Sequence, residues 1–155
     1  MGQEGVQKVF APTSICFGCG PANERGLRIN SIRCQGGLEA WVRPAPEHQA
    51  FPGMIAGGII GTILDCHGNW TAAISLMDAR GEHEPPTTVT ASYKVDLKRP
   101  TPTDVDLHVI SKVVSIDDPW VEVEMILTAE GKVRAEGTGR FVSVTEGHPA
   151  YHRWE

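Results

Sequence analysis

The chain has 155 residues, of which 41% are hydrophobic and 21% charged, and its formal net charge is −5. This length predicts one domain with a sizeable core, and the acidic balance excludes the basic surface that nucleic-acid binding requires. The longest apolar run, MIAGGIIGTIL, stops at Asp65, short of the ~20 residues of a membrane span. Without a secretory signal or a disulfide framework, we expect a cytoplasmic protein with reduced thiols and no membrane partner.

Residues 1–24 contain glycine, proline and the segment CFGCGPANERG, and we expect them to form an irregular N-terminal segment. The folded domain is expected over residues 25–145, and residues 146–155 are expected to be a C-terminal tail. At the start of this domain, LRINSIRCQGGLEAWV alternates loosely around Gly36 and Gly37, which predicts two short strands joined by a hairpin turn. A proline-rich loop, RPAPEHQAFPG, follows.

From about Gly57 to Met77, apolar residues recur at helical spacing and predict one long helix of ~30 Å. The remaining chain is rich in β-forming residues: TTVTASYKVDL, DVDLHVISKVVSI, WVEVEMILTAE and KVRAEGTGRFVSV. Short turns separate these stretches, which predicts a four-strand antiparallel meander. The fold class is therefore α+β, with a curved antiparallel sheet wrapped around one long central helix.

Asp65 is a carboxylate inside the most apolar helix, where an unpaired charge is costly. Gly57 and Gly58 open this helix, and their N–H groups can approach an anion or a developing oxyanion. Asp65 lies two turns beyond Gly58, and the residues three and four positions from it are small or polar: Gly61, Thr62, Gly68 and Asn69. This face is either a pocket wall or a small-residue stripe that packs closely on the sheet, with Asp65 capping a neighbouring backbone.

The arrangement PGMIAGGIIGTILD resembles the signature of the hotdog-fold acyl-CoA thioesterases, in the phenylacetate-pathway and 4-hydroxybenzoyl-CoA branch. The likeness extends from about Cys16 to Val144 and includes CFGCGPANERGLRI, TVTASYKVDLKRPTP and AEGTGRFVSV. It implies a hotdog fold that hydrolyses an acyl-CoA, with coenzyme A as part of the substrate and no separate cofactor. It also implies a homodimer or a dimer of dimers.

Carried over by position, the resemblance makes Asp65 the catalytic carboxylate, acting as general base or nucleophile. It makes Gly57 and Gly58 the glycine pair whose amide polarises the thioester carbonyl. The resemblance places His48 and Gln49 in the loop that supplies a polar group near the lytic water. It places Thr90 at the position of a hydroxyl that orients this water.

One position departs from the pattern, because Ala56 stands where the family has histidine. A non-catalytic acyl-thioester-binding protein is therefore an alternative. His48 and His67 are possible replacements, and we favour His48 because His67 falls on a different helix face from Asp65. A hotdog hydratase or dehydratase is a second alternative, although the Asp and His five residues apart that are usual there are not found.

The pair Cys16 and Cys19 has the spacing of zinc ligands, with Cys34 and His48 as possible completing ligands. Since no second tight pair is present, we expect no metal site and a loop that merely contains thiols. Cys66 is expected to be a core residue.

Lys94, Lys98 and Arg99 cluster near the end of a predicted strand in an otherwise acidic chain. They are either a solvated edge or the contact for the phosphates of coenzyme A.

Overall fold

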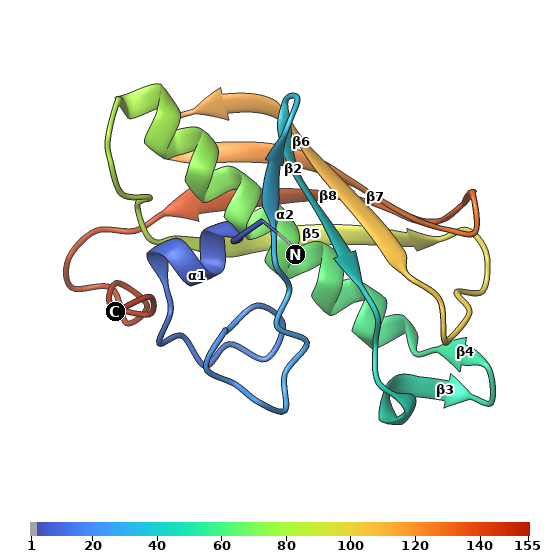
Figure 1. Cartoon of the computed structure of the whole chain (residues 1–155). Helices are drawn as coiled ribbons and strands as arrows, with labels where there is room; N and C mark the ends of the chain where they lie inside the picture. Colours follow the sequence, from blue (N-terminus) through green and yellow to red (C-terminus); the bar gives the residue numbers. More distant parts are fainter. Residues whose placement is uncertain (1–2) are drawn as a thin grey trace.

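A computed structural model describes residues 3–155 and shows one long helix, α2 (Gly57–Arg80), packed along a curved antiparallel sheet (Figure 1). The other elements are the helix α1 (Val6–Phe10), a 3-10 turn (Pro46–His48), and the strands β1 (Ile32–Cys34), β2 (Gly37–Val42), β3 (Gln49–Phe51), β4 (Met54–Ile55), β5 (Thr88–Leu97), β6 (Leu107–Asp117), β7 (Trp120–Ala129) and β8 (Lys132–Ser143). The predicted fold class is confirmed.

Helix α2 begins after Ala56, whose backbone is extended, and ends at Gly81, which adopts the left-handed conformation at φ 66°. The Gly81 N–H closes the helix by donating to the carbonyls of Met77 and Asp78. Buried residues occur all around α2, as expected for a helix enclosed in a core. Nevertheless, no helix within residues 3–155 is long and apolar enough to cross a membrane.

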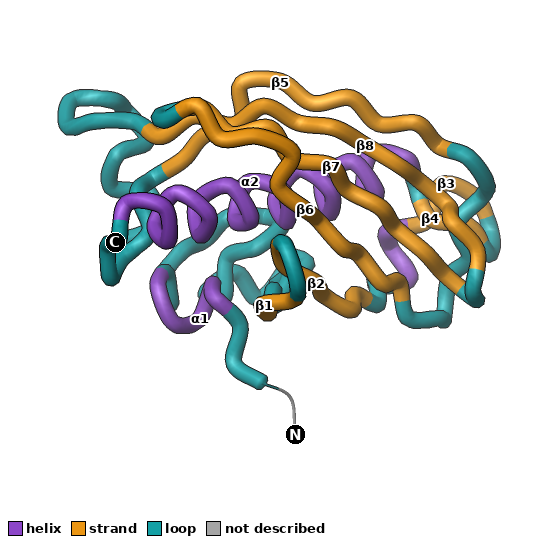
Figure 2. The backbone as a smooth tube through the Cα atoms, turned by 90° about the horizontal axis from the view of Figure 1, so that it is seen from above, coloured by secondary structure: helices purple, strands orange, loops and turns teal. Residues whose placement is uncertain are grey.

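The six-stranded sheet has the order β1-β2-β6-β7-β8-β5, with every neighbouring pair antiparallel (Figure 2). The predicted four-strand meander is therefore wrong in one respect: β6, β7 and β8 form a meander, but β5 pairs with β8 at the sheet edge. The segment 98–106 has the composition of a tight turn, but it connects β5 to β6 past the two strands that lie between them in the sheet, β7 and β8. The composition of a turn does not show the distance that the connection spans, so the sequence could not predict this strand order.

The N-terminal segment is not wholly irregular as predicted, because it contains α1. The buried Gln7 amide of α1 makes two hydrogen bonds of 2.8 Å to Ser31, donating to its Oγ and accepting from its N–H. A five-residue helix shows no usable periodicity, and this one is held by contacts far away in sequence.

At the other end of the chain, Trp154 is buried and its ring stacks on that of Trp70, with centroids 4.2 Å apart. The expected tail thus ends packed against α2.

Candidate active site

Asp65 and Thr90 form a half-buried pair between α2 and β5, in which the Thr90 hydroxyl donates to Asp65 Oδ1 at 2.6 Å. Burial raises the pKa of Asp65, and the nearby Cys16 raises it further. The hydrogen bond from Thr90 and the positive charge of Arg153 act in the opposite direction and lower this pKa. The result is an accessible carboxylate with a raised pKa and one oxygen fixed in position.

One face of α2 runs antiparallel along β5, so that helix residues four apart meet strand residues in reverse order. A Cβ added to Gly57 would lie 3.0 Å from Leu97, and one added to Gly61 would lie 3.7 Å from Tyr93. The later contacts continue the series: Asp65 with Thr90, and Asn69 with Thr88. Since β5 is the edge strand, this helix face lies at the open side of the sheet.

A β-bulge at Ala91 makes this alignment possible. The register of β5 against β8 shifts between Thr90 and Ser92, which leaves Ala91 as the extra residue. Strand side chains normally alternate, so Thr90 and Tyr93 would point to opposite faces without the bulge. The extra residue lets both side chains meet α2.

The sequence left two interpretations of the small residues around Asp65, a pocket wall or a stripe that packs closely on the sheet. In the structure these residues do not all have the same role. A Cβ at Gly68 would lie 2.8 Å from the sulfur of Met125 and 2.9 Å from the ring of Phe141, so this glycine serves close packing on the sheet. In contrast, a Cβ at Gly58 would meet no atom of residues 3–155 within 4 Å. The close-packing interpretation is therefore confirmed at Gly68, and the pocket wall stays a prediction for the other side of the helix.

Gly57 and Gly58 form the first turn of α2, where N–H groups have no partner within the helix. The first helical bonds come from the next two residues, Ile59 and Ile60, which both donate to the carbonyl of Ala56. Gly58 is exposed and lies seven residues before Asp65, which corresponds to about 10 Å along the axis. The two groups of one chain are too far apart to act on the same carbonyl.

His48 and Gln49 lie in the loop next to the helix start but do not join Asp65. The His48 carbonyl accepts from the Ala56 N–H at 2.9 Å, and its Nδ1 accepts from the Ala45 N–H at 2.9 Å. The neutral His48 ring therefore carries its proton on Nε2, which is free of that bond. The Gln49 amide is engaged by the backbone of its own loop.

His67 is fully buried, so it cannot replace the missing histidine at position 56. Its Nδ1 lies 2.7 Å from Ser31 Oγ and its Nε2 lies 2.9 Å from the Leu38 carbonyl oxygen.

The exposed cations at the far end of β5 each have a neighbour of their own. The three contacts are Lys94 to Asp96 at 3.6 Å, Lys98 to Glu136 at 4.0 Å, and Arg99 to the Val133 carbonyl at 2.9 Å. Because Leu97 lies beside Gly57, the cations following it are near the start of α2.

Sequence reasoning missed Arg153, which belongs to the expected tail. Its guanidinium donates to the Thr88 carbonyl at 3.3 Å and lowers the pKa of Asp65. Nothing in the local sequence indicates this role, since it depends on how the chain end folds back onto β5.

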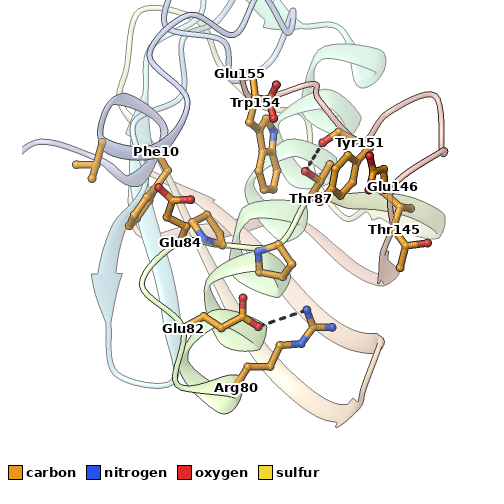
Figure 3. A pocket seen from close by; sticks show the side chains of 14 residues that line it. Phe10, Arg80, Glu82, Glu84, Thr87, Thr145, Glu146, Tyr151, Trp154 and Glu155 are labelled. Atoms are coloured by element: carbon orange, nitrogen blue, oxygen red, sulfur yellow. Dashed lines mark hydrogen bonds and ion pairs between the residues drawn. The ribbon is translucent and has the colours of Figure 1, made fainter.

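A cavity of about 640 Å³ lies at the opposite end of α2, and Asp65 is not among the residues lining it (Figure 3). Its charged residues are one cation and four carboxylates: Arg80, Glu82, Glu84, Glu146 and Glu155. This excess of negative charge is unfavourable for the phosphates of a nucleotide-containing substrate.

Neither protein-family models nor curated proteins match the chain. Solved structures do. The chain is similar to a thioesterase superfamily protein from Shewanella loihica PV-4, with TM-score 0.66 and 27% identity over 81% of this chain and 98% of that one. It is also similar to PaaI from the phenylacetic acid degradation operon of E. coli, with TM-score 0.65 and 13% identity, covering 77% and 81% of the two chains. A Streptococcus mutans UA159 protein bound to acetyl CoA has TM-score 0.63 and 14% identity, covering 75% and 88%.

The chain therefore has the hotdog fold that these thioesterase superfamily structures share. The resemblance inferred from the sequence is confirmed at this level.

Proposed function

We propose that the protein is a thioesterase that hydrolyses a small to medium acyl-CoA. The observation that carries this proposal is the Asp65–Thr90 pair: an accessible carboxylate with a raised pKa, oriented by a hydroxyl, on the open face of the central helix. The thioesterase superfamily fold supports it, as does the acetyl CoA bound by the similar Streptococcus mutans protein.

In the proposed reaction, Asp65 accepts a proton from a water molecule as the water attacks the thioester carbonyl carbon. The developing negative charge on the carbonyl oxygen is stabilised by the Gly58 N–H at the positive end of α2. When the carbon–sulfur bond breaks, the coenzyme A thiolate leaves and accepts the proton from Asp65, which regenerates the Asp65 carboxylate and gives free coenzyme A. Thr90 keeps one Asp65 oxygen in place throughout.

The Gly58 amide in this mechanism comes from a second protomer. Within one chain, the amide and the carboxylate are about 10 Å apart along α2. The edge strand β5 offers unpaired backbone groups, and exposed apolar side chains surround it and the helix start: Phe51, Tyr93 and Leu97. A two-fold dimer, or a dimer of dimers, would cover these surfaces and complete two equivalent sites.

The phosphates of coenzyme A would be bound by Lys94, Lys98 and Arg99. These residues are exposed and lie toward the end of the edge strand that meets the helix start. Their present acidic neighbours are exposed as well, so these ion pairs are weak and can exchange for phosphate.

A second candidate is an acyl-thioester-binding protein without catalysis, which Ala56 favours because its methyl side chain can donate no hydrogen bond at the start of α2. Incubation with a panel of acyl-CoAs, followed by chromatography of the released coenzyme A, separates the two functions. Thioesterase activity predicts release that is lost in Asp65→Asn. Saturable acyl-CoA binding without release would support the binding protein, and hydration of crotonyl-CoA would support a hydratase.

A further inference from the structure

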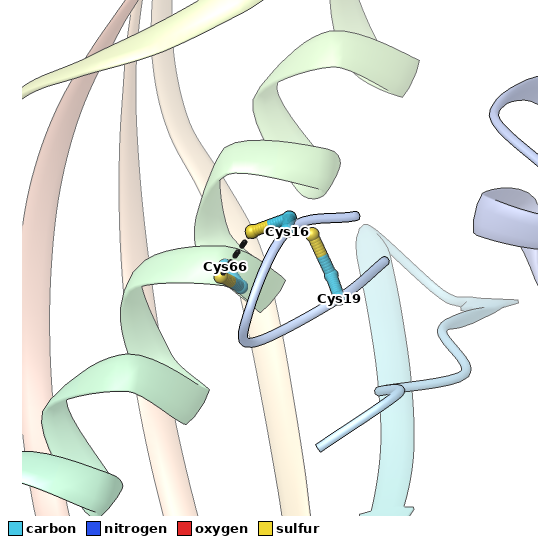
Figure 4. Close-up of side chains that lie close together, drawn as sticks. All are labelled: Cys16, Cys19 and Cys66. Carbon is cyan, nitrogen blue, oxygen red and sulfur yellow. Dashed lines mark hydrogen bonds between the residues drawn. The ribbon is translucent and has the colours of Figure 1, made fainter. Parts of the chain in front are cut away.

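Three cysteines from two separate parts of the sequence meet beside the candidate active site (Figure 4). The sulfurs of Cys16, Cys19 and Cys66 all lie within 4.8 Å of one another, and those of Cys16 and Cys66 are 3.7 Å apart. Cys34 and His48 are not part of this cluster, so the completing ligands suggested by the sequence are wrong. Cys66 follows Asp65 directly in α2 and, as predicted, belongs to the buried core.

The loop that carries Cys16 and Cys19 can approach α2 only because of its glycines. A Cβ at Gly18 would lie 2.3 Å from the sulfur of Cys66, and one at Gly20 would lie 2.4 Å from the Cys16 nitrogen. The loop is further closed by the Gly20 N–H, which donates to the Cys16 carbonyl at 2.8 Å. The glycines of the CFGCG sequence therefore allow the thiols of Cys16 and Cys19 to lie close to the thiol of Cys66.

The cluster is largely enclosed by the protein. Cys19 and Cys66 are buried and Cys16 is half-buried. Three thiols held close together in this way are a compact set of soft ligands.

We propose that Cys16, Cys19 and Cys66 form a three-thiolate site for a zinc ion. In a tetrahedral site with zinc–sulfur bonds of about 2.3 Å, ligand sulfurs lie ~3.8 Å apart. The Cys16–Cys66 separation already matches this value, and no pair needs to close by more than about 1 Å. Thiolate ligands favour zinc over the hard cations magnesium and calcium.

Binding displaces the three thiol protons to the solvent and involves no change of oxidation state. The fourth ligand is a water molecule, which can reach the ion past the half-buried Cys16. The bound ion joins the N-terminal loop to α2 one residue after Asp65, and so fixes the position of the segment that bears the carboxylate. This site does not depend on the proposed thioesterase reaction.

The test is a zinc titration of the full-length, reduced, metal-free protein in competition with a chromophoric chelator. We expect one zinc ion per chain, together with a rise in the thermal unfolding midpoint. Cobalt(II) in place of zinc should give thiolate-to-metal charge-transfer absorption and the intense visible bands of a tetrahedral complex.

Cys66→Ser and Cys16→Ser should each lose this zinc ion and the cobalt spectrum, whereas the matched control Cys34→Ser should keep both. Circular dichroism establishes whether each variant is folded. If the variant at the buried position, Cys66→Ser, does not fold, the Cys16→Ser variant alone provides the test. Unchanged zinc binding in the folded Cys16→Ser variant, or equal loss in Cys34→Ser, would overturn the assignment. Failure of the reduced wild-type chain to bind zinc would overturn it as well, including where the isolated protein holds a disulfide among these cysteines.

Discussion

The imidazole Nδ1 of His67 accepts a hydrogen bond from the hydroxyl of Ser31, with 2.7 Å between the two atoms. The direction is determined by the surrounding groups: Leu38 offers only a carbonyl to Nε2, so Nε2 must carry the proton. Ser31 in turn accepts from the Gln7 amide. This buried chain of hydrogen bonds joins α1, the segment before β1, α2 and β2, and it requires a neutral His67.

The neutrality of His67 predicts a pH-dependent stability. Burial lowers the pKa of His67 from 6.5 to about 4. Between these values the unfolded chain binds a proton that the folded chain does not, so the free energy of unfolding should decrease as the pH falls from about 6.5 toward 4. The full loss is about 3 kcal/mol. Urea unfolding at pH 7 and 4.5 measures it.

The matched variant for this experiment is His67→Gln, which has no imidazole to titrate. It should be less stable at pH 7 but should show a smaller change between pH 7 and 4.5. An equal change in both proteins would assign the effect to other groups.

Asp65→Asn should keep the fold and lose activity. The amide has nearly the same shape but accepts no proton from water, so kcat should fall by ~10² or more. Steady-state release of coenzyme A measures the loss, and circular dichroism with thermal unfolding serves as the control for folding. Wild-type turnover in the folded variant would remove Asp65 from the mechanism.

Thr90→Val should shift the pH profile of the reaction. The Thr90 hydroxyl lowers the pKa of Asp65, so its removal raises this pKa and leaves less of the active carboxylate at a given acidic pH. The acidic limb of kcat/KM should therefore move to higher pH, with a smaller loss at the plateau than in Asp65→Asn. A purely structural role for Thr90 would lower activity without moving that limb.

Two glycines of α2 offer a matched test of the oxyanion site. Gly58→Val should change the free energy of unfolding by less than ~1 kcal/mol, because the added side chain meets open space, and yet reduce turnover by crowding the carbonyl. Gly68→Val should destabilise the fold by about 1–3 kcal/mol, because it forces Met125 and Phe141 apart. Wild-type kinetics in Gly58→Val would mean that this amide does not bind the oxyanion.

Mixing the two inactive proteins Asp65→Asn and Gly58→Val should restore activity. If each site takes its carboxylate and its amide from different protomers, a mixed dimer contains one site with both groups intact. Recovery after subunit exchange, demonstrated with differently tagged chains, is the expected result. A monomer in sedimentation experiments, or no recovery after exchange has been demonstrated, would exclude the shared site.

The sequence predicts what local patterns encode. The period of the apolar residues locates α2, and the glycines at 36 and 37 locate the β1–β2 hairpin. Placing Asp65 near Thr90 relied on family resemblance, since the two residues lie in different elements. The position of β5 beside β8, the helix α1 and the union of Cys66 with the CFGCG loop all depend on contacts between distant parts of the chain. No local pattern carries that information.

The bulge at Ala91 makes one point of an edge strand tolerant of a change in length. Insertions and deletions are usually tolerated best where the chain is exposed, and Ala91 is exposed. Loss of this one small residue would leave Thr90 and Tyr93 two positions apart, and strict alternation along β5 would then place both side chains on the face that meets the helix. We therefore expect natural variation to include loss of residue 91 with the Asp65–Thr90 pair retained.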